Sequence, residues 1–171
     1  MINIDRTFYD FLNENVYSIT KEMPPSDERL RQMVGFIAEH KVSKVTNGTV
    51  KSALHYDVLV NKGKKLTNGI KLKKGDRIEV KGQALQTAGV CWAYNLSSKQ
   101  NNCEYIALCD MTKDKIRLSI IPEAEFFSVG EFNKAEGKEN QRFCWDGNYN
   151  TNSDNKKGRN AALFIKWEVA I

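Results

Sequence analysis

The sequence has little of several features that mark whole classes of protein. Cysteine is scarce, with four in 171 residues, and the four lack the spacing of zinc ligands. This excludes a disulfide scaffold and a zinc knuckle, and it predicts buried thiols. No apolar run approaches the roughly 18 residues that span a bilayer. Met1–Asp5 lacks the basic and apolar regions of a signal peptide. We therefore expect no membrane partner and a cytoplasmic, intracellular location.

Several catalytic motifs are also missing from the chain. The patterns GxxxxGK[ST], GxGxxG, GxSxG and HExxH do not occur. Their absence argues against P-loop and dinucleotide-binding proteins, α/β-hydrolases and zinc peptidases of the HExxH type. The hydrophobic content of 41% is enough for a real core at this length, and no linker divides the chain. We therefore expect one domain over residues 1–171.

The hydrophobic spacing changes along the chain and predicts three parts. Residues 1–50 carry helical spacing in two stretches, Phe8–Ile19 and a helix that begins at Ser26 and ends before Asn47-Gly48. Residues 54–127 alternate as strands do over 54–60, 77–81, 105–109 and 116–121, followed by a short helix from Pro122. Residues 128–171 predict a polar loop over 146–160 and a closing strand over 163–167. The chain therefore belongs to the α/β class.

The positive charge is concentrated in one connector. The chain as a whole carries +5, yet residues 62–81 hold eight Lys or Arg and two acids. Such a segment attracts a polyanion and makes its binding depend on salt. The alternative is a solvated hairpin that lysines keep soluble.

Two acids lie inside otherwise apolar strand patterns. They are Asp57, in His-Tyr-Asp-Val-Leu-Val, and Glu79, in Arg-Ile-Glu-Val-Lys. Glu79 and Lys81 share a strand face, and an adjacent strand would bring Asp57 beside them. Two carboxylates with the Val80 carbonyl suit Mg²⁺, which shares its remaining positions with water and phosphate. With Lys81 to assist the nucleophile, this set suits phosphodiester hydrolysis. The alternative is an ordinary amphipathic hairpin with an exposed Glu79–Lys81 pair.

The order Asp57, 21 intervening residues, then Glu79-Val80-Lys81 resembles the PD-(D/E)xK nuclease superfamily, which includes many type II restriction endonucleases. Tyr56 stands where the motif's name has proline. The resemblance implies a restriction-endonuclease-like mixed central β-sheet flanked by α-helices. It implies Asp57, Glu79 and the Val80 carbonyl as Mg²⁺ ligands and Lys81 as the catalytic lysine. Glu39 and Glu28 are candidates for a further acid from the preceding helix, and Gln83 for a supporting contact.

The resemblance implies double-stranded DNA as substrate and a homodimer that cuts both strands. The expected DNA contacts are the connector lysines and the polar tail, namely Lys62, Lys64, Lys65, Lys71, Lys73, Lys74, Asn148, Asn150, Lys156, Lys157 and Arg159. For the tail, a solvated surface loop is an equal alternative. A repair or junction-resolving nuclease of the same fold remains open. So does a non-catalytic nucleic-acid-binding module that uses the basic hairpin.

Overall fold

A computed structural model describes eight segments of the chain. They are residues 28–51, 56–83, 92–97, 102–112, 115–134, 140–145, 149–152 and 154–171. The predicted helix Phe8–Ile19 and Asn148 lie outside these residues. The elements are α2 (Glu28–Thr46), β1 (Gly48–Val50), β2 (Val58–Val60), β3 (Lys64–Lys65), β4 (Lys71–Leu72), β5 (Arg77–Gln83), β6 (Trp92–Ser97), β7 (Tyr105–Asp110), β8 (Arg117–Pro122), α3 (Glu123–Val129), β9 (Phe132–Lys134), β10 (Asn140–Trp145), α4 (Lys156–Lys166) and β11 (Glu168–Val169).

A mixed six-stranded sheet forms the centre of the protein. Its strand order is β1-β2-β5-β7-β8-β11. The β5–β7 pair is parallel, and the other neighbouring pairs are antiparallel. A second sheet has three strands in the order β6-β10-β9. The predicted α/β class with a mixed sheet and flanking helices is confirmed, with the central sheet mostly antiparallel.

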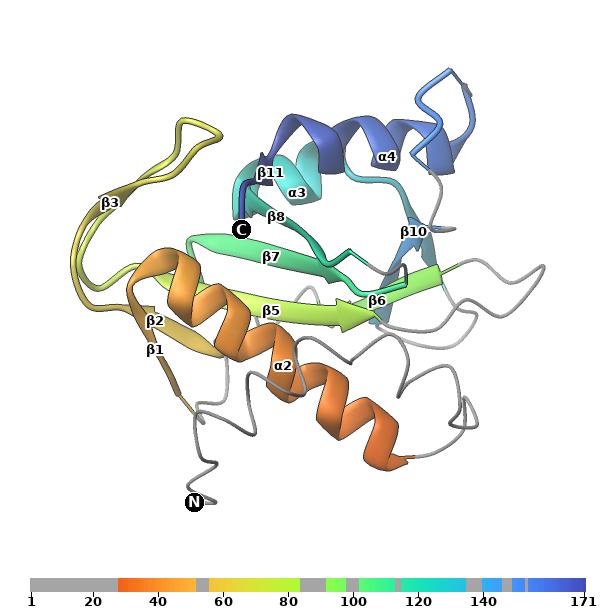
Figure 1. Ribbon diagram of the computed structural model, residues 1–171. Coiled ribbons are helices and arrows are strands. Elements are labelled where there is room, and N and C mark those ends of the chain that lie inside the picture. The colour runs from red at the N-terminus through yellow and green to blue at the C-terminus, as the bar shows by residue number, and fades with distance from the viewer. Residues whose placement is uncertain are drawn as a thin grey trace.

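Helices cover the two faces of the central sheet (Figure 1). Alternate residues of β7 point to opposite sides, so Ala107 packs with α2 while Ile106 packs with α3 and α4. The α2 face is closed by Ile37, which is fully buried. The opposite face is closed by Phe126, whose ring stacks on Phe143 at a centroid distance of 4.9 Å. Each face therefore has its own apolar core.

The helix α2 follows the predicted apolar stripe. Val34, Ile37, Ala38 and Val42 are buried at three- and four-residue spacing. The helix gives way at Asn47, which adopts a positive φ of 54°. The predicted turn at Asn47-Gly48 is therefore confirmed, and β1 begins directly after it.

The closing strand predicted over residues 163–167 is wrong. Residues 156–166 form α4, and the strand β11 covers only Glu168–Val169. The Asn155 side chain caps the helix by accepting a hydrogen bond from the N–H of Gly158 at 3.0 Å. Ala161 and Phe164, three residues apart, are both buried, as expected for one face of a helix. The polar residues 156–160, predicted as loop, supply the first turns of this helix.

Residues 61–76 form a projecting segment that we name the lysine arm. Its hairpin, β3 and β4, leaves the sheet edge and runs toward the C-terminal strand (Figure 1). The Asn68 side chain fastens the tip by donating to the carbonyls of Trp167 at 2.8 Å and Ile120 at 3.4 Å. The Ala170 N–H donates to Thr67 Oγ1 at 2.9 Å. Contacts distant in the sequence therefore hold the arm in place.

None of the helices in the described part of the chain is long and apolar enough to cross a membrane.

We expect Asn68→Ala to lower the free energy of unfolding by about 1–3 kcal/mol, because two backbone carbonyls lose a half-buried donor. Urea unfolding measures this loss. Hydrogen exchange at the Leu66 and Ala170 amides should also become faster. Unchanged exchange at both amides would show that the arm does not depend on Asn68.

Candidate functional site

Asp57 lies where β2 begins and β5 continues past it. Its N–H donates to the carbonyl of Ile78 at 3.0 Å, and Val58 pairs with Ile78. Two residues after Ile78, the backbone N–H of Val80 points to the same edge of β5 and donates to Asp57 Oδ2 at 2.7 Å. The strand β2 begins at Val58, so the Asp57 side chain, and not a strand backbone, accepts the hydrogen bond from this part of β5. This bond fixes the direction of the Asp57 carboxylate.

Glu79 and Lys81 project from β5 on the face opposite α2. Their neighbours Ile78 and Val80 are buried in the core beneath α2, so alternation places Glu79 and Lys81 on the other side. Lys81 Nζ forms an ion pair with Glu79 Oε1. The Glu79 side chain is 16% exposed and that of Lys81 is 28% exposed. Both groups are therefore accessible to a substrate while partly shielded from water.

The carboxyl groups of Asp57 and Glu79 meet, although 21 residues separate them in the sequence. Burial raises the pKa of Asp57, and the negative charge of Glu79 and a hydrogen bond between the two carboxyl groups raise it further. The hydrogen bond from the Val80 N–H and the charge of Lys81 lower the pKa of Asp57. A cation between the two carboxyl groups would offset the repulsion that raises the pKa of Asp57.

Glu39 on α2 belongs to the same electrostatic neighbourhood. Burial, followed by the charge of Asp57, raises its pKa from 4.5 to about 7, with a smaller contribution from Glu79 and an opposing one from Lys81. Glu28 begins the same helix eleven residues earlier, about 16 Å away along the axis. The structure therefore brings Glu39 toward Asp57 and leaves Glu28 distant.

Gly82 allows α2 to approach β5 closely, and the sequence analysis did not single it out. A Cβ at Gly82 would lie 2.9 Å from Val34 Cγ1 and 3.0 Å from both Ala38 Cβ and the Val34 carbonyl oxygen. Glu39 directly follows Ala38, so this contact sets the distance from Glu39 to the site. The only sequence signal is a glycine inside a strand pattern, directly after Glu79-Val80-Lys81.

The donors gathered here fit a hard divalent cation. Among the described residues, no group of three or more His, Cys, Asp or Glu side chains is arranged to hold a metal ion. Mg²⁺ does not need such a group, because one or two carboxylates suffice when waters and phosphate complete its shell. The Asp57–Glu79 pair meets that requirement. Val80, whose backbone faces Asp57, presents its carbonyl at the same edge of β5.

Gln83, the predicted supporting residue, is the last residue of β5. It lies on the strand face of Glu79 and Lys81 by alternation. Its carbonyl accepts a hydrogen bond from the N–H of Met111 at 2.7 Å. This bond continues the parallel β5–β7 contact past the end of β7.

The predicted DNA-contact lysines lie apart from this site. The lysine arm follows Val60, at the other end of β2 from Asp57. Lys64 Nζ donates to the Val45 carbonyl at 2.7 Å, where it satisfies the C-terminal end of α2. The other five predicted arm lysines are exposed, namely Lys62, Lys65, Lys71, Lys73 and Lys74.

The predicted tail contacts lie on or near α4. Arg159 is paired with Glu131 at 2.7 Å, and Lys156 Nζ donates to the Phe132 carbonyl at 3.2 Å. Lys157 lies on the same first turn of the helix. Asn150 is exposed, and its Oδ1 accepts from the N–H of Asn152 at 3.0 Å. Arg159 and Lys156 therefore have structural partners, and DNA contact by the tail stays a prediction.

Gly82→Ala is expected to lower the free energy of unfolding by about 1–3 kcal/mol, because the added methyl group overpacks the contact between α2 and β5. Gly35→Ala on the same helix is the control, since a Cβ there meets nothing within 4 Å. The control should gain up to about 1 kcal/mol from helix propensity. Urea unfolding of both variants measures the contrast, and equal effects would show that the close approach is not constraining.

In EDTA at pH 8, Glu39→Gln should raise the free energy of unfolding by on the order of 1 kcal/mol, after allowance for solvent screening. The folded protein holds the Glu39 proton up to a pKa of about 7, whereas the unfolded chain releases it near 4.5. The wild-type protein therefore loses stability relative to the variant as the pH rises between these values. Below pH 4.5 the difference disappears.

Urea unfolding across pH 4 to 8 measures this dependence. Glu104→Gln is a control of opposite sign, because hydrogen bonds from Arg77 lower the pKa of Glu104. Glu104 therefore stabilises the folded state above its unfolded pKa, and its loss should cost stability at pH 8. A loss of stability at pH 8 in Glu39→Gln would contradict the crowding of carboxylates around Asp57.

Comparison with known proteins adds no relative. No model of a known protein family matches the chain, and a search of curated proteins finds no match. The candidate site is therefore defined by its own geometry. That geometry consists of two carboxyl groups in contact, a lysine paired with one of them, and a third acid supplied by the helix α2.

Proposed function

We propose that this protein is a Mg²⁺-dependent endonuclease of the PD-(D/E)xK type that hydrolyses phosphodiester bonds in double-stranded DNA. The observation that carries the proposal is the meeting of Asp57 with Glu79, while Lys81 pairs with Glu79. These three residues come from two parts of the sequence and converge at one sheet edge. An ordinary amphipathic hairpin does not require an acid from a neighbouring segment to join its surface ion pair.

Each residue has a distinct part in the proposed chemistry. Asp57, held by the Val80 N–H, and Glu79 would bind Mg²⁺ together with the Val80 carbonyl. Mg²⁺ in such a site polarises the phosphate and lowers the pKa of bound water. Lys81 orients the attacking water and offsets the negative charge that develops on the phosphate. The attacking water loses a proton as its oxygen bonds to phosphorus, the bond from phosphorus to the leaving oxygen breaks, and the leaving oxygen takes up a proton.

A type II restriction endonuclease acting as a homodimer is the form of this activity that we favour. Cutting both strands of a symmetric DNA site calls for two active sites related by a two-fold axis. A repair or junction-resolving nuclease would use the same residues on another DNA structure. A non-catalytic binding module is the second candidate function, favoured by the five exposed lysines of the arm.

The test is incubation of the wild-type protein with mixed plasmid DNA in Mg²⁺ and in EDTA. We expect cleavage in Mg²⁺ alone. Asp57→Ala and Lys81→Ala should each lose at least about 100-fold in rate, as expected for removal of a group that stabilises developing charge. Matched controls are Asp154→Ala and Lys115→Ala, which remove exposed charges elsewhere. Both should cut like the wild type.

The products separate the alternatives. Discrete bands indicate a restriction enzyme, and preferential cutting of branched DNA indicates a repair enzyme. Binding without any cutting would overturn the nuclease proposal in favour of the binding module. Full activity in Asp57→Ala would overturn the assignment of the site.

A further inference from the structure

The lysine arm carries a charge that the candidate active site does not use. Residues 61–76 include six lysines and one acid, Asp76. Five of these lysines are exposed, and the sixth, Lys64, is bonded to the end of α2. The one acid, Asp76, accepts a hydrogen bond from the backbone N–H of Lys73, and the segment keeps a large positive excess.

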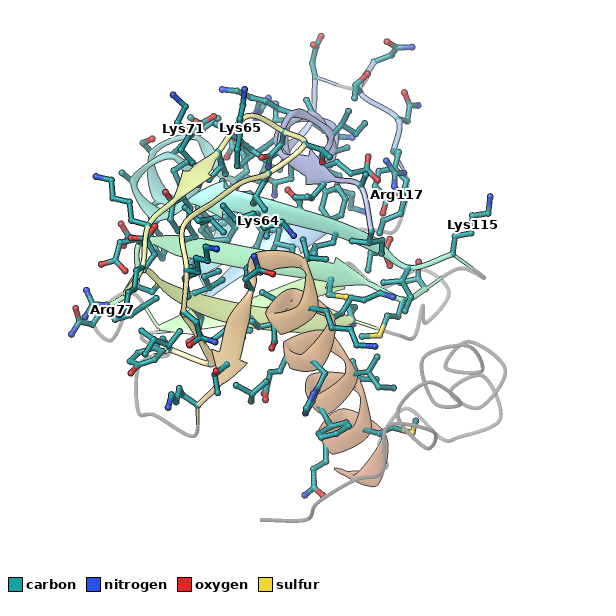
Figure 2. All side chains as sticks on the ribbon, turned by 60° about the vertical axis from the view of Figure 1, so that its left-hand side comes forward. Lys64, Lys65, Lys71, Arg77, Lys115 and Arg117 are labelled. Carbon is teal, nitrogen blue, oxygen red and sulfur yellow. The ribbon has the colours of Figure 1, made fainter. Side chains whose placement is uncertain are left out.

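Two of the exposed lysines face each other across the hairpin. Lys65 pairs with Lys71 in the β3–β4 register. Opposed like charges in a cross-strand pair destabilise a hairpin. Within the described part of the chain, neither ammonium group forms an ion pair with a carboxylate. Figure 2 shows Lys65 and Lys71 together at the end of the arm, well separated from Lys115. An anion between them would relieve the repulsion.

Packing and hydrogen bonds anchor the arm to the rest of the protein despite this repulsion. Leu66, Ile70 and Leu72 are buried in the core on the α2 side of the sheet. Asn68 and Thr67 fasten the tip to the C-terminal segment. The two ammonium groups are therefore presented from an ordered backbone, and binding an anion costs little backbone entropy.

The arm is within reach of a duplex that occupies the candidate active site. Lys71 precedes Glu79 by eight residues, so their backbones are at most about 30 Å apart. A DNA duplex rises about 3.4 Å for each base pair, so this span corresponds to about nine base pairs. A 30-base-pair duplex centred on the site extends about 15 base pairs to each side, which is longer than this span.

We propose that the lysine arm is a separate phosphate clamp, in which Lys65 and Lys71 hold the DNA backbone about nine base pairs or less from the bond to be cut. This inference rests on the proposed function, since it assigns the DNA substrate of that site a second contact outside the site. The clamp contributes affinity and salt dependence and takes no part in the chemical step. It does not discriminate between base sequences, because phosphates carry no sequence information.

Binding of a 30-base-pair duplex of mixed sequence, measured in EDTA by fluorescence anisotropy, tests the clamp without cleavage. Wild-type protein is compared with the double variant Lys65→Gln/Lys71→Gln from 50 to 200 mM salt. Loss of two phosphate contacts should flatten the slope of log K against log salt by about 2. The control Lys115→Gln/Lys166→Gln removes the same charge from exposed positions outside the arm and should leave the slope close to that of the wild type.

An arm variant with the wild-type slope, an equal loss in the control variant, or an absence of duplex binding by the wild type would each overturn the clamp.

These results are independent of the nuclease test. Cleavage by Mg²⁺-loaded wild-type protein with an unchanged arm variant would leave the proposed function standing and remove the clamp. Arm-dependent binding without any cleavage would do the reverse. If both hold, the arm variant should show a raised KM on long duplexes with an unchanged kcat.

Discussion

The close packing of α2 on β5 is the constraint on which the rest of the structure depends. Gly82 leaves room for Val34 and Ala38 to touch the strand, and the same contact buries Ile78 and Val80. Because Val80 is fixed in that core, its N–H has a definite direction at the sheet edge, where it meets Asp57 Oδ2. The helix therefore positions one carboxylate through the strand and carries another, Glu39, on its own side.

Electrostatic crowding follows from that packing. Glu39 lies on α2, Glu79 on β5 and Asp57 directly before β2, and the charges of Asp57 and Glu79 both raise the pKa of Glu39. Lys81 offsets only part of this negative charge, since among the described residues its ammonium group forms an ion pair with Glu79 only. The excess negative charge at this sheet edge attracts cations. The exposed lysines lie away from it, on the lysine arm.

The sequence predicted the strands β5, β7 and β8 and the helix α2 well, because their apolar spacing is regular. It failed at α4, where Leu163, Phe164 and Ile165 give an apolar run that reads equally as a strand. The Asn155 side chain caps this segment and its apolar residues are buried against the sheet, and both contacts stabilise a helix there. The choice between Glu28 and Glu39 was also beyond the sequence, since it depends on where along β5 the helix crosses.

By itself, the sequence determined the chemistry available to this protein. Spacing of two along one strand places Glu79 and Lys81 on the same face, and an acid inside an apolar strand pattern requires a partner. Only the tertiary structure decided that Asp57 and Glu79 are each other's partners, because their contact depends on β2 beginning where β5 runs on. Only the tertiary structure placed the lysines as well. Loop residues carry no periodic pattern, so the course of the arm depends on Asn68, Thr67 and the distant C-terminal backbone that they bind.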